Sequence, residues 1–185
     1  VIVFGTSFTA SFFYDKLSAA RRRHYHLGFA KRLLSGHQGQ LNELAPQLAY
    51  HFEAGGDVKQ AIEFRNLATQ QSAQRFAYTE AIQHITKVIS LSTSDEDATA
   101  HLGARKKHCG FLLASGKLPE TISEYQQLIT ASQQAGAGSC EIDATLGLAD
   151  TLFWVDRQAC LTTAEQAVTL ARQTNDENLI IHTQG

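Results

Sequence analysis

The hydrophobic positions of this sequence recur at helical spacing, in segments of several turns that are separated by short polar or glycine-containing breaks. Almost no segment shows the strict alternation of a half-buried strand. The short apolar run "VIVFG" at residues 1–5 begins with three β-branched residues, and we interpret it as a short strand before a helix over 8–17. The spacing then predicts helices over the ranges 19–35, 41–54, 58–74, 79–92, 95–115, 119–134, 140–154 and 157–174.

The breaks between these segments carry residues that end and begin helices. Gly55 and Gly56 supply a left-handed helix end, because glycine adopts positive φ without strain. Asp57 is expected to cap the next helix, with Gln60 completing a capping box. Ser94 is the expected cap of the helix that follows the polar stretch "STSDED".

The chain repeats itself after each of four turns. A small residue is followed by an aliphatic one and by further apolar positions in "QAIEFRNLA", "EAIQHITKVI", "ETISEYQQLI" and "ACLTTAEQAV". The small residues are Ala61, Ala81, Thr121 and Cys160, and the two later intervals between them are about twice the first. A helix-pair period of about 40 residues is typical of an α-solenoid. We therefore predict an all-α fold built as a stack of about four helix hairpins.

Two stretches, "LGLADTLFWVDRQACLTTAEQAVTLAR" and "HCGFLLASGKLPETISEYQQLI", resemble tetratricopeptide (TPR) repeats. Arg65 and Ile85 stand where the family usually has an aromatic residue, and the repeat is longer than the family's usual unit. The resemblance implies a divergent variant with long helices and a concave groove that holds a peptide or a partner domain. By the same analogy, Trp154 is expected in the core. Four residues are candidates for the groove: Tyr50, Glu53, Lys106 and Asp150.

A second resemblance covers residues 1–91. "VIVFGTSFTASFFYDKLSAARRRHYHLGFAKRLL" and the following "LAYHFEAGGDVKQAIEFRNLA" look like the segment after the ATPase module of bacterial STAND-type signalling ATPases, which are joined to nucleotide cyclases, kinases or transcription activators. The resemblance implies a winged-helix-like remnant over 1–35 and a repeat domain over 41–185, truncated at its C-terminus. Thr6 stands where that family usually has His. A chain with no Met fits a piece of such a longer protein.

Composition and charge add context. Three cysteines with neither a C-x-x-C pair nor an even count favour a reducing, cytoplasmic setting, and no apolar run is long enough to span a membrane. Residues 1–32 carry six Lys or Arg against one acid, whereas residues 33–185 carry ten against seventeen. Arg21, Arg22 and Arg23 form the centre of this basic segment. We interpret them as a solvated face or as a patch that docks on the ATPase module, with DNA contact as the alternative.

The sequence offers no catalytic or cofactor motif. A Walker-type phosphate loop and a G-x-S-x-G elbow are both absent. His101, His108 and Cys109 are the best metal-ligand grouping among eight histidines, but no Asp or Glu completes their helix face, so we expect packed or solvated side chains and no metal. His51 and His84 are interpreted in the same way.

These observations predict a non-catalytic segment that binds a protein or peptide, including other domains of its own parent chain, and that requires no cofactor. It would act as the sensor or scaffold of a multidomain signalling ATPase or transcriptional regulator. The alternative is a DNA-binding regulator fragment that uses residues 1–35, although the acidic body makes nucleic acid an unfavourable partner. A stand-alone enzyme is the third interpretation, and the missing catalytic motifs disfavour it. The sequence leaves the oligomeric state open.

Overall fold

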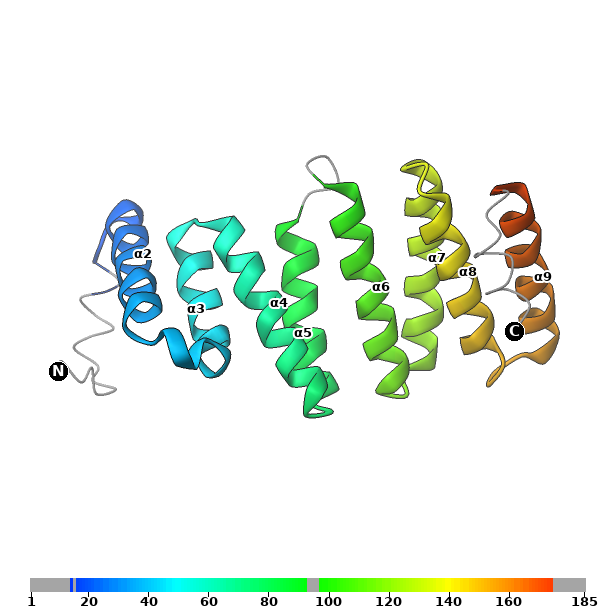
Figure 1. Cartoon of the computed structure of the whole chain (residues 1–185), viewed down its shortest axis with the longest axis horizontal. Helices are drawn as coiled ribbons and strands as arrows, with labels where there is room; N and C mark the ends of the chain where they lie inside the picture. Colours follow the sequence, from blue (N-terminus) through cyan, green and yellow to red (C-terminus); the bar gives the residue numbers. More distant parts are fainter. Residues whose placement is uncertain (1–13, 15, 93–96, 175–185) are drawn as a thin grey trace. The chain divides into compact units, whose positions relative to one another are not determined.

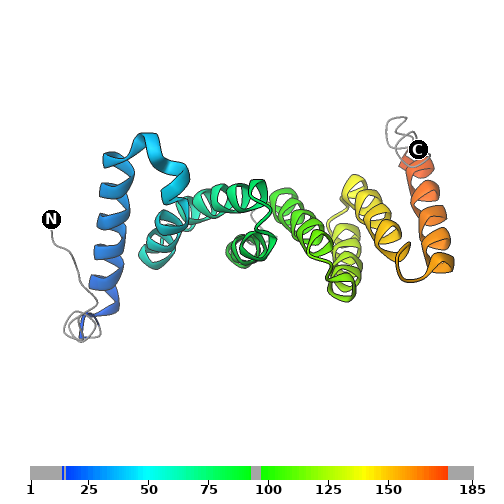
Figure 2. The same ribbon diagram turned by 90° about the horizontal axis from the view of Figure 1, so that it is seen from below.

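The computed structural model describes Tyr14 and the ranges 16–92 and 97–174, and it divides the chain into two compact units, 1–68 and 69–185. Every regular element in these ranges is helical (Figures 1 and 2). The helices are α2 (Ala19–Gly36), the 3₁₀ turn η1 (Gln38–Gln40), α3 (Leu41–Gly55), α4 (Val58–Gln74), α5 (Tyr78–Leu91), α6 (Ala98–Ala114), α7 (Leu118–Gln134), α8 (Gly138–Leu152) and α9 (Arg157–Thr174). The expected strand at 1–5 and the helix at 8–17 lie almost entirely outside the described residues.

The first unit is built on α2, α3 and the first part of α4. Leu48, Ala49 and Phe52 of α3 are buried, and the ring of Phe52 stacks on Phe64 of α4 with the centroids 5.6 Å apart. Gly55 lies against the backbone of Leu27, because a Cβ at this position would stand only 3.1 Å from the Leu27 nitrogen. The absence of a side chain therefore allows the end of α3 to approach α2 closely.

In the second unit each helix from α5 to α9 packs on the next along the chain, and α6 also contacts α8 (Figure 2). The core between α6, α7 and α8 consists of apolar residues that are less than a tenth exposed. They are Leu102, Cys109, Tyr125, Leu128, Ala144 and Leu148. Small side chains recur at these contacts, which lets the helix axes approach each other as they do in paired-helix repeats.

Four helices end in the same backbone motif. Gly56, Phe76, Gly116 and Gly136 have φ values of 82°, 58°, 72° and 64°. In each case the next residue donates its N–H to a carbonyl five residues earlier, as Lys117 does to Leu112 at 3.0 Å. This is the Schellman ending, which satisfies carbonyls that the helix leaves free. The middle interval between the four positions is twice each of the outer ones, and α5, which lies within it, ends at Leu91 without this motif.

The helix starts confirm some expected caps and correct others. The carboxylate of Asp57 accepts the Gln60 backbone N–H at 3.2 Å, as predicted, but the amide of Gln60 donates to Glu63 and the N–H of Asp57 to Phe52, so no capping box forms. The cap of α6 is Asp97, whose carboxylate accepts from Ala100 at 2.9 Å. The predicted cap, Ser94, lies outside the described residues.

The burial pattern confirms the repeat anchors and corrects another assignment. Ala61, Ala81 and Thr121 are fully buried, and Cys160 is half-buried. Trp154 was expected in the core, but it is 72% exposed because it lies in the turn after α8 rather than on the packed face of the helix.

Candidate functional site

Two of the predicted groove residues lie on one polar face in the second unit. Lys106 of α6 pairs through its Nζ with the carboxylate of Asp143 on α8, and about half of the Lys106 side chain is exposed. Asp150 follows Asp143 by seven residues, so both aspartates lie on the same side of α8 two turns apart. Asp150 is exposed. We call Lys106, Asp143 and Asp150 the α6–α8 polar face.

Sequence reasoning missed Asp143. Its seven-residue spacing to Asp150 is visible in the sequence, but the contact with Lys106 depends on how α6 and α8 pack across the intervening α7. The ion pair also means that the Lys106 ammonium is not an unpaired cation, because Asp143 already accepts a hydrogen bond from it. A ligand at this face therefore meets a paired cation and an exposed aspartate rather than a free positive charge.

Tyr50 and Glu53, the other predicted groove residues, lie on α3 in the first unit. The Tyr50 side chain is 53% exposed. Glu53 accepts a hydrogen bond from the guanidinium of Arg65 on α4 at 2.8 Å, and both side chains are largely buried. Glu53 thus ties α3 to α4, whereas Tyr50 remains accessible.

Tyr50 borders a cluster of aromatic side chains around His26. The Nδ1 atoms of His26 and His51 are 2.8 Å apart, and the Tyr14 hydroxyl is 2.8 Å from the Nε2 of His26. Burial, together with the charge of nearby His26, lowers the pKa of His51. Two imidazole nitrogens at this distance share one proton, so the neutral form of one ring is needed for the contact. These histidines are packing residues of the α2–α3 contact.

The basic patch lies on α2. Arg21 and Arg23 are exposed, while the guanidinium of Arg22 lies over the ring of Tyr14, 5.5 Å from its centroid. Successive residues on a helix are about 100° apart, so the three arginines point in different directions. The Arg22 guanidinium is therefore already in contact with an aromatic ring, and Arg21 and Arg23 are the residues of this patch that are accessible to a partner.

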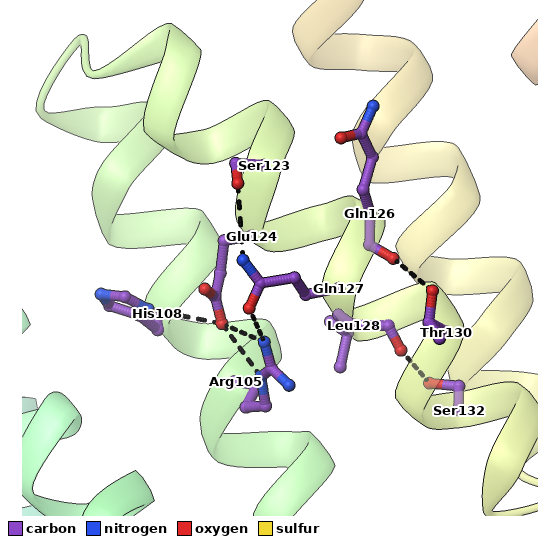
Figure 3. Close-up of polar contacts among 9 residues, drawn as sticks. All are labelled: Arg105, His108, Ser123, Glu124, Gln126, Gln127, Leu128, Thr130 and Ser132. Carbon is purple, nitrogen blue, oxygen red and sulfur yellow. Dashed lines mark hydrogen bonds and ion pairs between the residues drawn. The ribbon is translucent and has the colours of Figure 1, made fainter.

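A polar network joins α6 to α7 (Figure 3). Arg105 donates to Glu124 at 2.9 Å and to Gln127 at 3.1 Å, and His108 lies 3.8 Å from the same Glu124 oxygen. His108 and Arg105 together hold the pKa of Glu124 below its usual value, against the opposing effect of burial. The sequence indicated no acidic partner for His108 because Glu124 comes from a different helix.

The histidines and cysteines form no metal-binding group within the described ranges. His101 contacts the hydroxyl and carbonyl of Ser92 at 3.0 and 3.1 Å, and His108 faces Glu124. Cys109 is fully buried, and burial raises its pKa to about 12, so its thiol is protonated at neutral pH. In the same part of the chain, none of the helices is both long and apolar enough to cross a membrane.

No protein-family model matches the sequence. No curated protein matches it either. Solved structures do match. BtubC (BKLC) from P. vanneervenii has a TM-score of 0.55 and 12% identity, and the match covers 91% of this chain and 81% of that chain. The nearly identical TPR-like repeats of a kinesin light chain protein from Podospora anserina have a TM-score of 0.45 and 16% identity, over 85% of this chain and 98% of that chain.

At 12% identity the likeness to BtubC concerns the fold alone. It agrees with the structure described above: consecutive helices of similar length, four of which share one type of helix ending, and small residues at the contacts. The described chain therefore has a TPR-like α-helical repeat fold.

Proposed function

We propose that this chain is a non-catalytic scaffold whose helical repeats bind a protein or peptide partner. The observation that carries the proposal is the α6–α8 polar face. It combines charged side chains from two helices that are not consecutive in the chain, and only the packing of the repeats brings them together. Stacked helix pairs use such composite surfaces to hold partners.

We further propose that the chain serves as the sensor segment of a multidomain signalling ATPase. The support for this is the resemblance of residues 1–91 to the segment that follows the ATPase module in STAND-type proteins. In this proposal Arg21 and Arg23 dock on that module, and the repeats report partner binding to it. The gene of the whole protein tests this directly. A phosphate-binding loop encoded upstream of residue 1 is expected, and a parent gene without any nucleotide-binding module would contradict it.

A peptide-display selection on the immobilised chain tests the scaffold function. We expect the selection to yield peptides that bind saturably to the wild-type chain. The Lys106→Glu variant should bind them at least fivefold more weakly, because it places a third carboxylate beside Asp143 and Asp150 and breaks the existing pair.

Lys107→Glu is the matched control, since Lys107 is exposed on the same helix and the substitution makes the same change in charge. Its affinity should stay within twofold of wild type. If the two variants weaken binding equally, the α6–α8 polar face is not the binding surface. A selection that yields no saturable ligand would contradict the scaffold function itself.

A further inference from the structure

The second unit contains a groove on a different surface from the α6–α8 polar face. It has a volume of about 520 Å³ and lies between α7, α8 and α9. Helix α8 contributes Glu141, Thr145 and Leu148 to its lining. These positions lie about half a turn around α8 from Asp143 and Asp150. Helix α8 thus separates the α6–α8 polar face from the groove, and the groove has no part in the function proposed above.

The threonines that line the groove have already used their only hydrogen-bond donors. The hydroxyls of Thr145, Thr163 and Thr169 donate to carbonyls of their own helices, at 2.8, 2.7 and 2.8 Å. A hydroxyl has one proton and two lone pairs, so each of these oxygens is left only as an acceptor. These threonines therefore present only hydrogen-bond acceptors to the groove, whereas a threonine with a free hydroxyl proton would be both a donor and an acceptor.

The charged and amide side chains of the groove extend this pattern. Glu141 accepts from the amide nitrogen of Gln133 at 2.8 Å, which leaves the second carboxylate oxygen of Glu141 as an acceptor and one N–H and the oxygen of the Gln133 amide unused by this bond. Glu165 of α9 is exposed at the rim. None of the described residues that line the groove is Lys, Arg or His. The lining thus carries negative charge without a compensating cation.

The rest of the lining is apolar. Ile129 of α7, Leu148 of α8 and Leu170 of α9 supply hydrocarbon surface beside the two carboxylates. Long basic side chains bury an aliphatic stem on such a surface and keep a charged head among acceptors. Arginine matches the groove best, because its guanidinium has five donors and no acceptor.

We propose that the groove between α7, α8 and α9 binds a basic peptide segment, with an arginine or lysine side chain lying along Ile129, Leu148 and Leu170 and its cation held by Glu141 and Glu165. This inference rests on the proposed scaffold function and names the chemistry of one partner. The charge complementarity of the groove selects this occupant over an acidic peptide, which would meet two like charges and, among the lining side chains, only the amide N–H groups of Gln133 and Gln166 as donors.

Fluorescence anisotropy with two labelled hexapeptides tests the inference, one with the sequence Ala-Arg-Ala-Ala-Arg-Ala and one in which Glu replaces Arg. At near-physiological salt the intact chain should bind the arginine peptide saturably and should not bind the glutamate peptide. Glu165→Lys should weaken binding at least tenfold. Thr169→Arg should abolish it, because a guanidinium of the chain itself then occupies the groove.

Two control variants separate the groove from the general charge of the protein. Glu120→Lys makes the same charge change at an exposed position on α7 outside the groove, and Thr86→Arg makes the same substitution at an exposed threonine of α5 with the same type of backbone hydrogen bond. Both should bind within twofold of wild type. Circular dichroism on all four variants should show wild-type helix content, which makes a loss of binding specific to the surface.

Several other outcomes would contradict the basic-peptide inference. The inference fails if the arginine peptide does not bind, if the glutamate peptide binds equally, or if Glu120→Lys weakens binding as much as Glu165→Lys does. It also fails if the chain self-associates in sedimentation velocity and Thr169→Arg prevents this, since a second copy is then the occupant. If the display selection yields ligands sensitive to Lys106→Glu while the arginine peptide fails, only the basic-peptide inference is lost and the scaffold function stands.

Discussion

Phe76 holds a backbone conformation that glycine adopts at three equivalent helix ends. Its φ is 58°, compared with 82°, 72° and 64° at Gly56, Gly116 and Gly136. A bulky side chain incurs a steric penalty of about 1–2 kcal/mol in this left-handed region. Burial offsets little of this penalty, because the Phe76 side chain is 76% exposed.

Phe76→Gly should therefore stabilise the chain. We expect the free energy of unfolding to rise by about 0.5–1 kcal/mol, which is the relieved strain less the greater conformational freedom of glycine in the unfolded state. Urea unfolding followed by circular dichroism measures the change. Gly116→Ala makes the opposite change at an equivalent position and should lower stability by a similar amount. A destabilised Phe76→Gly variant would show that the exposed ring makes contacts that outweigh the strain.

Gly147 is the second residue whose lack of a side chain matters. A Cβ at this position would overlap the end of the Tyr125 side chain, at its Cζ, hydroxyl oxygen and Cε1 atoms, and Tyr125 is only 7% exposed in the core. Gly147→Ala should therefore lower the free energy of unfolding by about 1–3 kcal/mol through overpacking.

The matched variant is Gly110→Ala, because Gly110 is also helical but has nothing within 4 Å of an added Cβ. This variant should gain about 0.5–1 kcal/mol from helix propensity. A double-mutant cycle with Tyr125→Ala identifies the cause, since the cost of Gly147→Ala should disappear when the ring is removed. If it persists there, the steric account of Gly147 is wrong.

At the scale of the elements, the α6–α7 contact depends on an ionised carboxylate. His108 and Arg105 lower the pKa of Glu124 in the folded chain below its usual value of 4.5. A carboxyl with a depressed folded pKa stabilises the folded state above its unfolded pKa, and this contribution is lost as the pH falls through the folded pKa. The contact between α6 and α7 should therefore weaken in acid.

Glu124→Gln removes this ionisation. We expect the wild-type chain to lose more unfolding free energy than Glu124→Gln does when the pH is lowered from 7 to below 4.5, the usual glutamate pKa. Denaturant titrations across that range measure the difference. Glu120→Gln, an exposed change on the same helix, should follow the wild type. His51 titrates in all three proteins and does not affect the comparison. Parallel curves for wild type and Glu124→Gln would contradict the assigned role.

The sequence predicted the helices well where their ends carry a chemical marker. Gly56, Gly116 and Gly136 end helices in the left-handed conformation that glycine favours, and Asp57 caps α4 as expected. The sequence predicted the break between the helices near Phe76, but it did not predict the left-handed backbone of Phe76, because an aromatic residue rarely holds a positive φ. The assignment of Trp154 to the core failed because apolar character alone does not distinguish a packed helix face from a turn.

At the scale of the whole chain, the sequence revealed the period of a helix pair, and the two outer intervals between the left-handed helix ends are half that period. The candidate site was less predictable. Lys106 and Asp150 stay a prediction as groove residues, whereas Asp143, Glu124 and the groove between α7, α8 and α9 depend on contacts between different helices. The spacing of residues along the sequence indicates which face of a helix they share, but it does not indicate which other helix packs against that face.

We propose that these helical repeats bind a partner through a composite surface. An NMR titration of the isotopically labelled chain with a display-selected peptide tests it most directly. We expect saturable shift changes at one peptide per chain, concentrated in α6 and α8 around Lys106, Asp143 and Asp150. Shift changes that do not saturate, or that spread evenly over the helices, would contradict it.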